Sequence, residues 1–153
     1  MPDVFTQTKR SEVMSRIRSR GNKDTELRLV ALMRECGITG WRRHASLALR
    51  VPGSRFPVSG SQGRVRPDFV FRRERVAVFV DGCFWHGCPR HATLPVGNRK
   101  FWDAKLARNK ARDREVSRAL RRAGWTVLRI WECALTKKRQ AATMARVGRA
   151  LGR

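Results

Sequence analysis

The sequence predicts a small mixed α/β domain in which helices flank a sheet. Its 153 residues suggest one domain, and a hydrophobic content of 41% is enough to bury one core. The patterns along the chain run in the order helix, strands, helix, strand, helix, which is typical of a mixed sheet covered by helices. No internal repeat or low-complexity tract argues for another architecture.

The elements follow from residue spacing. A helix is expected at about residues 24–36, where Leu29, Leu32, Met33 and Cys36 share one face and Gly37 is a natural stop. Residues 68–71 and 76–80 read as two strands of a hairpin. A long helix at 98–123, a strand at 125–131 and a basic helix at 138–151 follow. We expect a short helix in the arm 1–21, and loops at 50–66 and 89–98.

The charge predicts a polyanionic partner. Lys and Arg number 35 against 12 Asp and Glu, giving a formal charge of +23, which favours nucleic acid. The start of the chain lacks the apolar segment of a secretion signal, and the longest clean apolar run, 76–80, is far too short to span a membrane. We therefore expect a cytoplasmic protein with no membrane partner.

A cluster of metal-ligand side chains follows the strand at 76–80. Cys83, Cys88 and His91 lie close together in sequence, and Cys133, after a later strand, supplies a fourth ligand type. Cys3His is a set that structural zinc prefers, although free thiols with a surface histidine remain the alternative. The pattern of a zinc deaminase is absent, because no His-x-Glu motif is present.

Carboxylates mark the predicted hairpin. Asp68 follows Pro67 and opens one strand, and Asp81 ends the next, so the pair could hold Mg²⁺ against a phosphodiester. This arrangement has the shape of the proline-aspartate nuclease pattern, without its usual closing lysine. His86 could replace that lysine as general acid or base. Taken alone, Pro-Asp is more simply a turn.

Polar side chains interrupt two apolar helix faces. Glu26 shares a face with Leu29, Val30 and Met33, which fits either a site residue or stabilisation of the helix dipole. Asp113 interrupts the apolar stripe of the long helix. A buried carboxylate needs a partner, which could be one of the many arginines or a catalytic histidine that it orients.

Large aromatic side chains gather around the same motif. Phe84 and Trp85 follow Gly82 in a predicted loop, and Phe101 and Trp102 begin the long helix. Such groups can unstack a duplex, or can pack in the core, which the pattern favours for Phe101.

These residues together resemble the very-short-patch repair (Vsr) DNA mismatch endonucleases. The resemblance rests on residues 66–70, on the motif from Asp81 to His91, on Phe101-Trp102, on Asn109 with Arg112-Asp113, and on 124–125 with 130–133. It covers about residues 3–136. It implies a restriction-endonuclease-like core of the PD-(D/E)xK type, a structural Zn²⁺ and a catalytic Mg²⁺. The implied domains are a basic arm 1–21, an endonuclease domain 22–136 and a basic C-terminal helix or tail 137–153.

The resemblance also implies an activity and a role for each residue. The enzyme would nick double-stranded DNA 5′ to the thymine of a T:G mismatch left by deamination of 5-methylcytosine, as a nucleoid-associated bacterial protein with mismatch-repair proteins as partners. The implied roles are Mg²⁺ binding by Asp68 and the Val80 backbone, proton transfer by His86 oriented by Asp113, assistance by Glu26 and Asp81, intercalation by Phe84, Trp85 and Trp102, and zinc binding by Cys83, Cys88, His91 and Cys133.

Two other functions remain compatible with the residues. One is a non-catalytic, zinc-stabilised DNA-binding module, and the other is a related nuclease with a different DNA substrate. Residues 51–65 form a longer connection than is usual in the family and could touch DNA. Because nicking one strand needs one site, we expect a monomer.

Overall fold

The computed structural model describes residues 6, 8–9, 25–49, 63–91 and 96–153. In chain order from residue 25 its elements are α2 (Glu26–Glu35), β1 (Trp41–Arg43), β2 (Leu47–Ala48), β3 (Arg64–Val65), β4 (Phe69–Phe71), β5 (Val76–Asp81), α3 (Arg99–Arg122), β6 (Thr126–Trp131), the 3₁₀ helix η1 (Glu132–Leu135) and α4 (Gln140–Ala150).

The main sheet is mixed. Its four strands lie in the order β1-β4-β5-β6. Strand β4 pairs with β1 and with β5 in antiparallel orientation, and β6 pairs with β5 in parallel orientation. The parallel pair is joined by α3, because parallel neighbours need a long crossover connection. Strands β2 and β3 form a separate antiparallel pair. The mixed sheet flanked by helices confirms the predicted α/β class.

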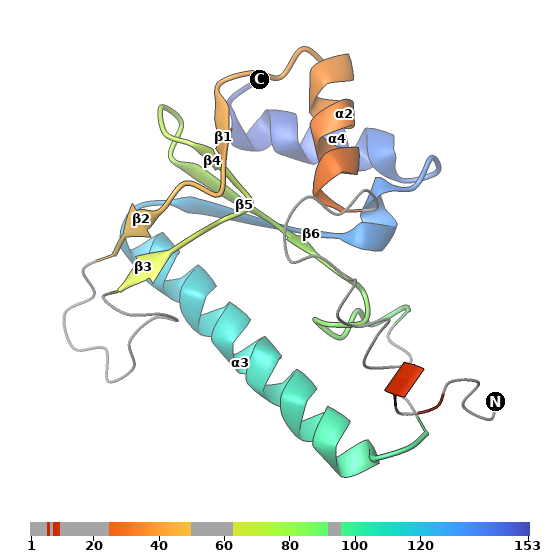
Figure 1. Cartoon of the computed structure of the whole chain (residues 1–153). Helices are drawn as coiled ribbons and strands as arrows, with labels where there is room; N and C mark the ends of the chain where they lie inside the picture. Colours follow the sequence, from red (N-terminus) through yellow and green to blue (C-terminus); the bar gives the residue numbers. More distant parts are fainter. Residues whose placement is uncertain (1–5, 7, 10–24, 50–62, 92–95) are drawn as a thin grey trace.

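The helices cover both faces of the sheet (Figure 1). Alternation along the strands explains this, because successive side chains point to opposite faces. Phe69 and Phe71 pack in the cluster that contains the apolar residues of α2 and α4. Val70, between them, packs instead with Val116 and Leu120 of α3. Each face of β4 therefore has its own apolar layer.

Most predicted elements are confirmed within the described residues. The helices expected at 24–36, 98–123 and 138–151 correspond to α2, α3 and α4, and the strands expected at 68–71, 76–80 and 125–131 correspond to β4, β5 and β6. The expected loop at 50–66 is wrong at its end, where β3 forms, and β1 and β2 were not expected. These strands are too short to show alternation. The helix expected in residues 1–21 and residues 50–62 of the loop lie outside the described residues.

No helix in the described part of the chain is long and apolar enough to cross a membrane.

Candidate active site

One group of side chains gathers where α2 begins and β1 and β4 meet. Glu26 is the first residue of α2, His44 directly follows β1, and Asp68 directly precedes β4. Ligand atoms of these three residues all lie within 4.8 Å of one another. We call them the Asp68 group. Arg43 contributes a cation, because its Nη2 donates to Glu26 Oε2 at 2.7 Å.

Asp68 is poised to change its protonation state. Burial raises the pKa of Asp68 to about 7, and the negative charges of Glu26 and Asp81 act in the same direction. The backbone N–H of Val80 opposes this effect by donating to Asp68 Oδ2 at 2.7 Å. Without a bound metal ion, the carboxylates of Glu26 and Asp81 repel that of Asp68, so the Asp68 group favours binding of a proton or a metal cation.

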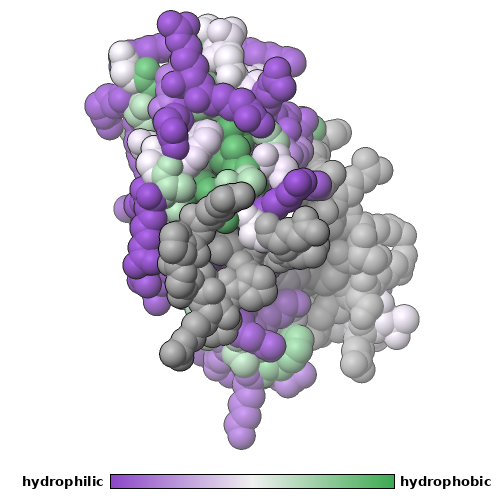
Figure 2. Space-filling model, turned by 90° about the vertical axis from the view of Figure 1, so that its left-hand side faces the viewer, coloured by the Kyte–Doolittle hydropathy of each residue, from purple (hydrophilic) through white to green (hydrophobic). Residues whose placement is uncertain are grey.

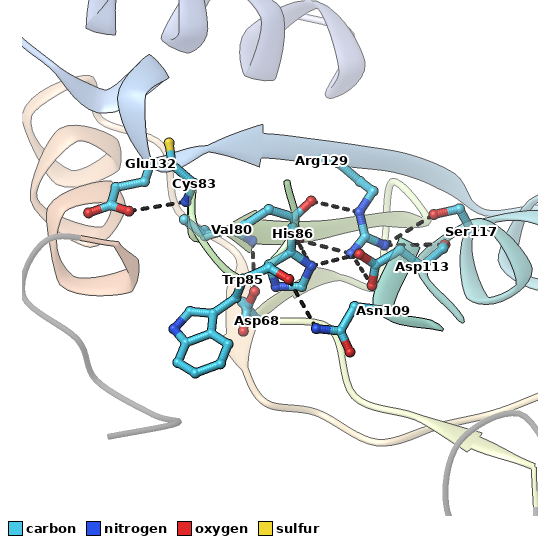
Figure 3. A network of polar contacts seen from close by, with 11 residues as sticks. Asp68, Val80, Cys83, Trp85, His86, Asn109, Asp113, Ser117, Arg129 and Glu132 are labelled. Carbon is cyan, nitrogen blue, oxygen red and sulfur yellow. Dashed lines mark hydrogen bonds and ion pairs between the residues drawn. The ribbon is translucent and has the colours of Figure 1, made fainter. Parts of the chain in front are cut away.

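A second group is built around His86, which lies in the loop after β5. His86 Nδ1 is 2.6 Å from Asp113 Oδ2, on the middle of α3 (Figure 3). An ionised carboxylate only accepts hydrogen bonds, so Nδ1 carries the proton that it donates. The same nitrogen is 3.8 Å from Asp81 Oδ1. The pairing leaves Nε2 as the nitrogen that can exchange a proton with a substrate.

Arg129 joins the two carboxylates of this second group. It lies on β6 and binds Asp81 with both arms of its guanidinium, from Nε to Oδ2 at 2.8 Å and from Nη2 to Oδ1 at 3.0 Å. Its Nη2 is also 2.9 Å from Asp113 Oδ1. Figure 3 shows the Arg129 guanidinium beside the carboxylate of Asp113. A bidentate pair of this kind fixes geometry as well as charge.

The charges around His86 set its pKa. Burial lowers it, but the hydrogen bond to Asp113 and the negative charge of Asp81 outweigh burial, so the pKa of His86 lies above its ordinary value. For Asp113, burial raises the pKa, but the bond to His86 and the charge of Arg129 overcome it, so its pKa lies below its ordinary value. The pair therefore favours a protonated imidazole beside an ionised carboxylate.

Aromatic residues directly precede His86 in the loop after β5. The ring centroids of Phe84 and Trp85 are 5.1 Å apart, and Phe84 and Trp102 are 5.4 Å apart. Lys105 Nζ sits over the Trp85 ring at 5.2 Å. Trp85 points away from the His86 network in Figure 3, while its carbonyl accepts from Asn109 Nδ2 at 3.0 Å. Phe84 and Trp85 are half-buried, which leaves part of each ring available for contact.

Phe101 lies beside this aromatic group at the start of α3. Its ring centroid is 5.4 Å from that of Trp102. It is 46% exposed, so the expected core packing is wrong.

The predicted zinc ligands come together where the segment after β5 meets η1. Ligand atoms of Cys83, Cys88, His91 and Cys133 all lie within 4.8 Å of one another. Cys88 Sγ is 3.8 Å from Cys133 Sγ and 3.8 Å from His91 Nδ1. A tetrahedral ion with Zn–S bonds of about 2.3 Å would place two sulfur ligands about 3.8 Å apart. The donor set and its spacing fit a tetrahedral metal ion.

The thiols of this set differ in acidity. Burial raises the pKa of Cys88, but hydrogen bonds from the Arg90 backbone and from His91 outweigh it and lower the value to about 6. Burial raises the pKa of Cys83 to about 12. Cys88 therefore favours the thiolate form that binds metal.

The surface near the His86 group is basic. An open hollow of about 620 Å³ is lined by Asp113, Ser117 and Arg129, and also by Arg114, Arg118, Arg121 and Arg122 of α3. Such a surface suits phosphate groups. On the face of the molecule shown in Figure 2, hydrophilic side chains border a small apolar area among the described residues.

The structure therefore divides the predicted site residues into neighbouring groups. Glu26 and Asp68 share one group, with the Val80 backbone beside it, whereas Asp81 lies with His86 and Asp113. Sequence reasoning missed Arg129 and His44. Arg129 had a readable signal, because it interrupts the apolar run Leu128 to Ile130 on a buried strand. His44 follows a strand too short to give a pattern.

Comparison with known proteins identifies the family. The family model described as DNA mismatch endonuclease Vsr matches residues 46–91. The chain is 36% identical over 138 residues to the DNA mismatch endonuclease Vsr of Escherichia coli (strain K12), covering 88% of this chain and 76% of that protein. The chain belongs to the Vsr family. It is therefore an endonuclease that acts on DNA.

Other relatives of this Vsr-family endonuclease are named as nicking enzymes. The type II nicking enzyme V.NmeDIP of Neisseria meningitidis serogroup C is 39% identical over 150 residues, covering 91% of this chain and 89% of that protein. The type II nicking enzyme V.NaeI of Lentzea aerocolonigenes is 53% identical over 73 residues. That match covers 48% of this chain and 44% of V.NaeI, less than half of either.

Proposed function

We propose that this endonuclease nicks one strand of double-stranded DNA, 5′ to the thymine of a T:G mismatch that arises from deamination of 5-methylcytosine. The observation that carries the proposal is that the half-buried aromatic residues Phe84 and Trp85 directly precede His86 in the loop after β5, where Asp113 holds the imidazole. Residues whose rings can enter a base stack therefore share one loop with the group that handles protons. This arrangement suits an enzyme that inspects a base pair before it cuts the adjacent phosphodiester.

The residues of the Asp68 group fit a divalent cation. Asp68 and Glu26 would supply carboxylate oxygens, and Val80, whose N–H donates to Asp68 Oδ2, would add its backbone carbonyl as a further oxygen ligand. Mg²⁺ held there would stabilise the charge on the phosphate and on the leaving oxygen. The raised pKa of Asp68 shows that its negative charge is destabilised by burial and by nearby carboxylates, and a bound cation would offset that effect.

His86 is the proton-transfer group of the proposal. Its Nδ1 is held by Asp113, so Nε2 can take a proton from the attacking water or give one to the leaving oxygen. Asp113 and Asp81 act as positioning residues, because both favour the charged imidazole and Arg129 fixes both of them.

The aromatic residues Phe84, Trp85 and Trp102 would intercalate beside the mismatch. A mismatched base pair unstacks at a lower free-energy cost than a Watson–Crick pair does, which gives a physical basis for selectivity between the two. The arginines that line the hollow near α3 are available for backbone phosphates.

The remaining parts of the proposal concern architecture and partners. We infer a restriction-endonuclease-like core, a structural Zn²⁺ held by Cys83, Cys88, His91 and Cys133, and a monomeric enzyme that works with mismatch-repair proteins. The donor set and the sulfur spacing support the zinc assignment.

The direct test is strand nicking on end-labelled duplexes that differ only in one pair, T:G or C:G. We expect a nick just 5′ to the mispaired thymine, present with Mg²⁺ and absent with EDTA. Equal cutting of both duplexes would contradict mismatch selectivity and favour a nuclease with another DNA substrate. The flanking sequence should be varied across duplexes, so that dependence on the neighbouring bases is separated from recognition of the mismatch.

Asp113→Asn is expected to slow nicking by about a hundredfold or more, because a neutral amide neither orients nor stabilises the charged imidazole. The pKa of His86 should fall towards its ordinary value, so the inflection in the pH profile of single-turnover nicking should move to lower pH. Asp103→Asn is the matched control on the same helix, since that side chain is 55% exposed and pairs only weakly with Arg99. An unchanged pH profile in Asp113→Asn would remove Asp113 from this role.

A further inference from the structure

His44 is the member of the Asp68 group to which neither the sequence motifs nor the family resemblance assigns a role. The ladder between β1 and β4 brings it there, since Arg43 is opposite Phe69 and the His44 N–H donates to the Asp68 carbonyl at 3.1 Å. An imidazole nitrogen of His44 thus lies within 4.8 Å of carboxylate oxygens of both Glu26 and Asp68.

The backbone of His44 is unusual. Its φ is +52°, in the left-handed region that side-chain-bearing residues adopt at a free-energy cost of roughly 1 kcal/mol or more. The pairing with β4 holds the residue in this conformation. Such outliers concentrate at functional sites, because the surrounding structure must fix the side chain in one direction.

The Nε2 atom of His44 lies at ion-pair distance from a carboxylate oxygen of Glu26. His44 Nε2 is buried and lies 2.8 Å from Glu26 Oε2, yet the pair lacks the alignment of a hydrogen bond. Around an octahedral ion with bonds of about 2.1 Å, neighbouring ligand atoms lie about 3 Å apart. The nitrogen and the oxygen are therefore spaced like adjacent ligands of one ion.

The charges nearby are compatible with a bound cation. Glu26 and Asp68 supply two carboxylates, and Arg43 already offsets part of the charge on Glu26. A neutral imidazole adds a ligand without adding charge, so the number of donor atoms rises while repulsion between them does not. Imidazole is a ligand that transition metals accept more readily than Mg²⁺ does.

We propose that His44 Nε2 is a direct ligand of the divalent ion at Asp68, so that this site binds Mn²⁺ more tightly than Mg²⁺. The inference rests on the proposed divalent-ion site. It adds a nitrogen ligand to a site otherwise made of oxygen atoms.

The test is pulsed EPR of Mn²⁺ bound to the full-length protein, loaded with zinc and carrying no histidine tag. We expect a nitrogen coupling to Mn²⁺ in the wild type that His44→Asn removes and His86→Asn retains. Asparagine is the suitable replacement, because it tolerates the left-handed backbone and is too short to supply the same ligand atom. Titrations should show the Mn²⁺ affinity falling by at least about tenfold in His44→Asn, with a smaller loss for Mg²⁺.

The outcomes separate this inference from the proposed function. Mn²⁺ that binds in an Asp68-dependent manner without nitrogen coupling, or a coupling that survives His44→Asn, would overturn the role of His44 alone. Absence of Asp68-dependent Mn²⁺ binding would overturn both. If His44→Asn does not fold, wild-type protein labelled with ¹⁵N-histidine gives the decision, because the isotope must change the coupling if an imidazole binds the ion.

Discussion

Asp68→Asn is expected to abolish nicking while making the metal-free protein more stable. Nicking should fall by about a thousandfold or more, because in the proposed mechanism Asp68 is a principal ligand of the cation that would stabilise the reacting phosphate. DNA binding should persist, since it depends on the many basic side chains. The gain in stability follows from the pKa of Asp68, which is raised from 3.8 to about 7 in the folded protein.

The sign of this stability effect follows from proton binding. Between about pH 4 and pH 7 the folded state holds more protons at Asp68 than the unfolded state does, so the free energy of unfolding falls as pH rises. At pH 8 the wild type carries the full cost of a buried, repelled carboxylate. Asparagine removes that charge and can still accept the Val80 N–H. We expect its melting temperature at pH 8, without divalent metal, to rise by about 3 °C or more.

A matched comparison separates this effect from a general response to lost charge. Glu74→Gln changes a half-buried carboxylate in the turn between β4 and β5, outside the three groups of possible metal ligands. It should leave nicking unchanged. Added Mg²⁺ should stabilise the wild type and Glu74→Gln but not Asp68→Asn. A lower melting temperature in Asp68→Asn, or nicking at the wild-type rate, would contradict the assignment of Asp68.

Helix α3 shows how much of this molecule the sequence predicts. Its buried positions Trp102, Leu106, Val116 and Leu120 recur at helical spacing, so both the helix and its buried face could be read in advance. Asp113 stood out because it breaks that face, and it has both of the partners that were considered, an arginine and a histidine. Periodicity identifies a polar residue that needs a partner, but the identity of the partner depends on tertiary structure.

Short strands and long-range pairing account for what could not be predicted. Strand β1 has the sequence Trp-Arg-Arg, which carries no alternation, yet its pairing with β4 places His44 against Asp68. Arg129 reaches Asp81 because β6 returns parallel to β5 after the crossover helix, and sequence spacing does not specify that return. Both missed residues thus enter the site through sheet pairing between distant segments.

Cys88→Ser is the second change with a large expected effect. We expect the variant not to bind the proposed zinc ion, because Cys88 lies at the centre of the cluster, 3.8 Å from both Cys133 Sγ and His91 Nδ1. The melting temperature should fall by about 10 °C or more, since a structural zinc ion contributes several kcal/mol to folding. Zinc content by atomic absorption and thermal unfolding with and without chelator measure the two effects.

The position of the cluster makes this loss functional as well as structural. Cys83 and Cys88 flank His86 in the loop after β5, and Cys133 anchors that loop to η1. Without the ion, His86 should lose its fixed distance to Asp113, so nicking should fall together with zinc content. Cys36→Ser is the matched control, because Cys36 is exposed and belongs to none of the three possible metal-ligand groups. A Cys88→Ser protein with unchanged zinc and melting temperature would exclude Cys88 as a ligand, and the tight loop would then owe its shape to its hydrogen bonds and packing.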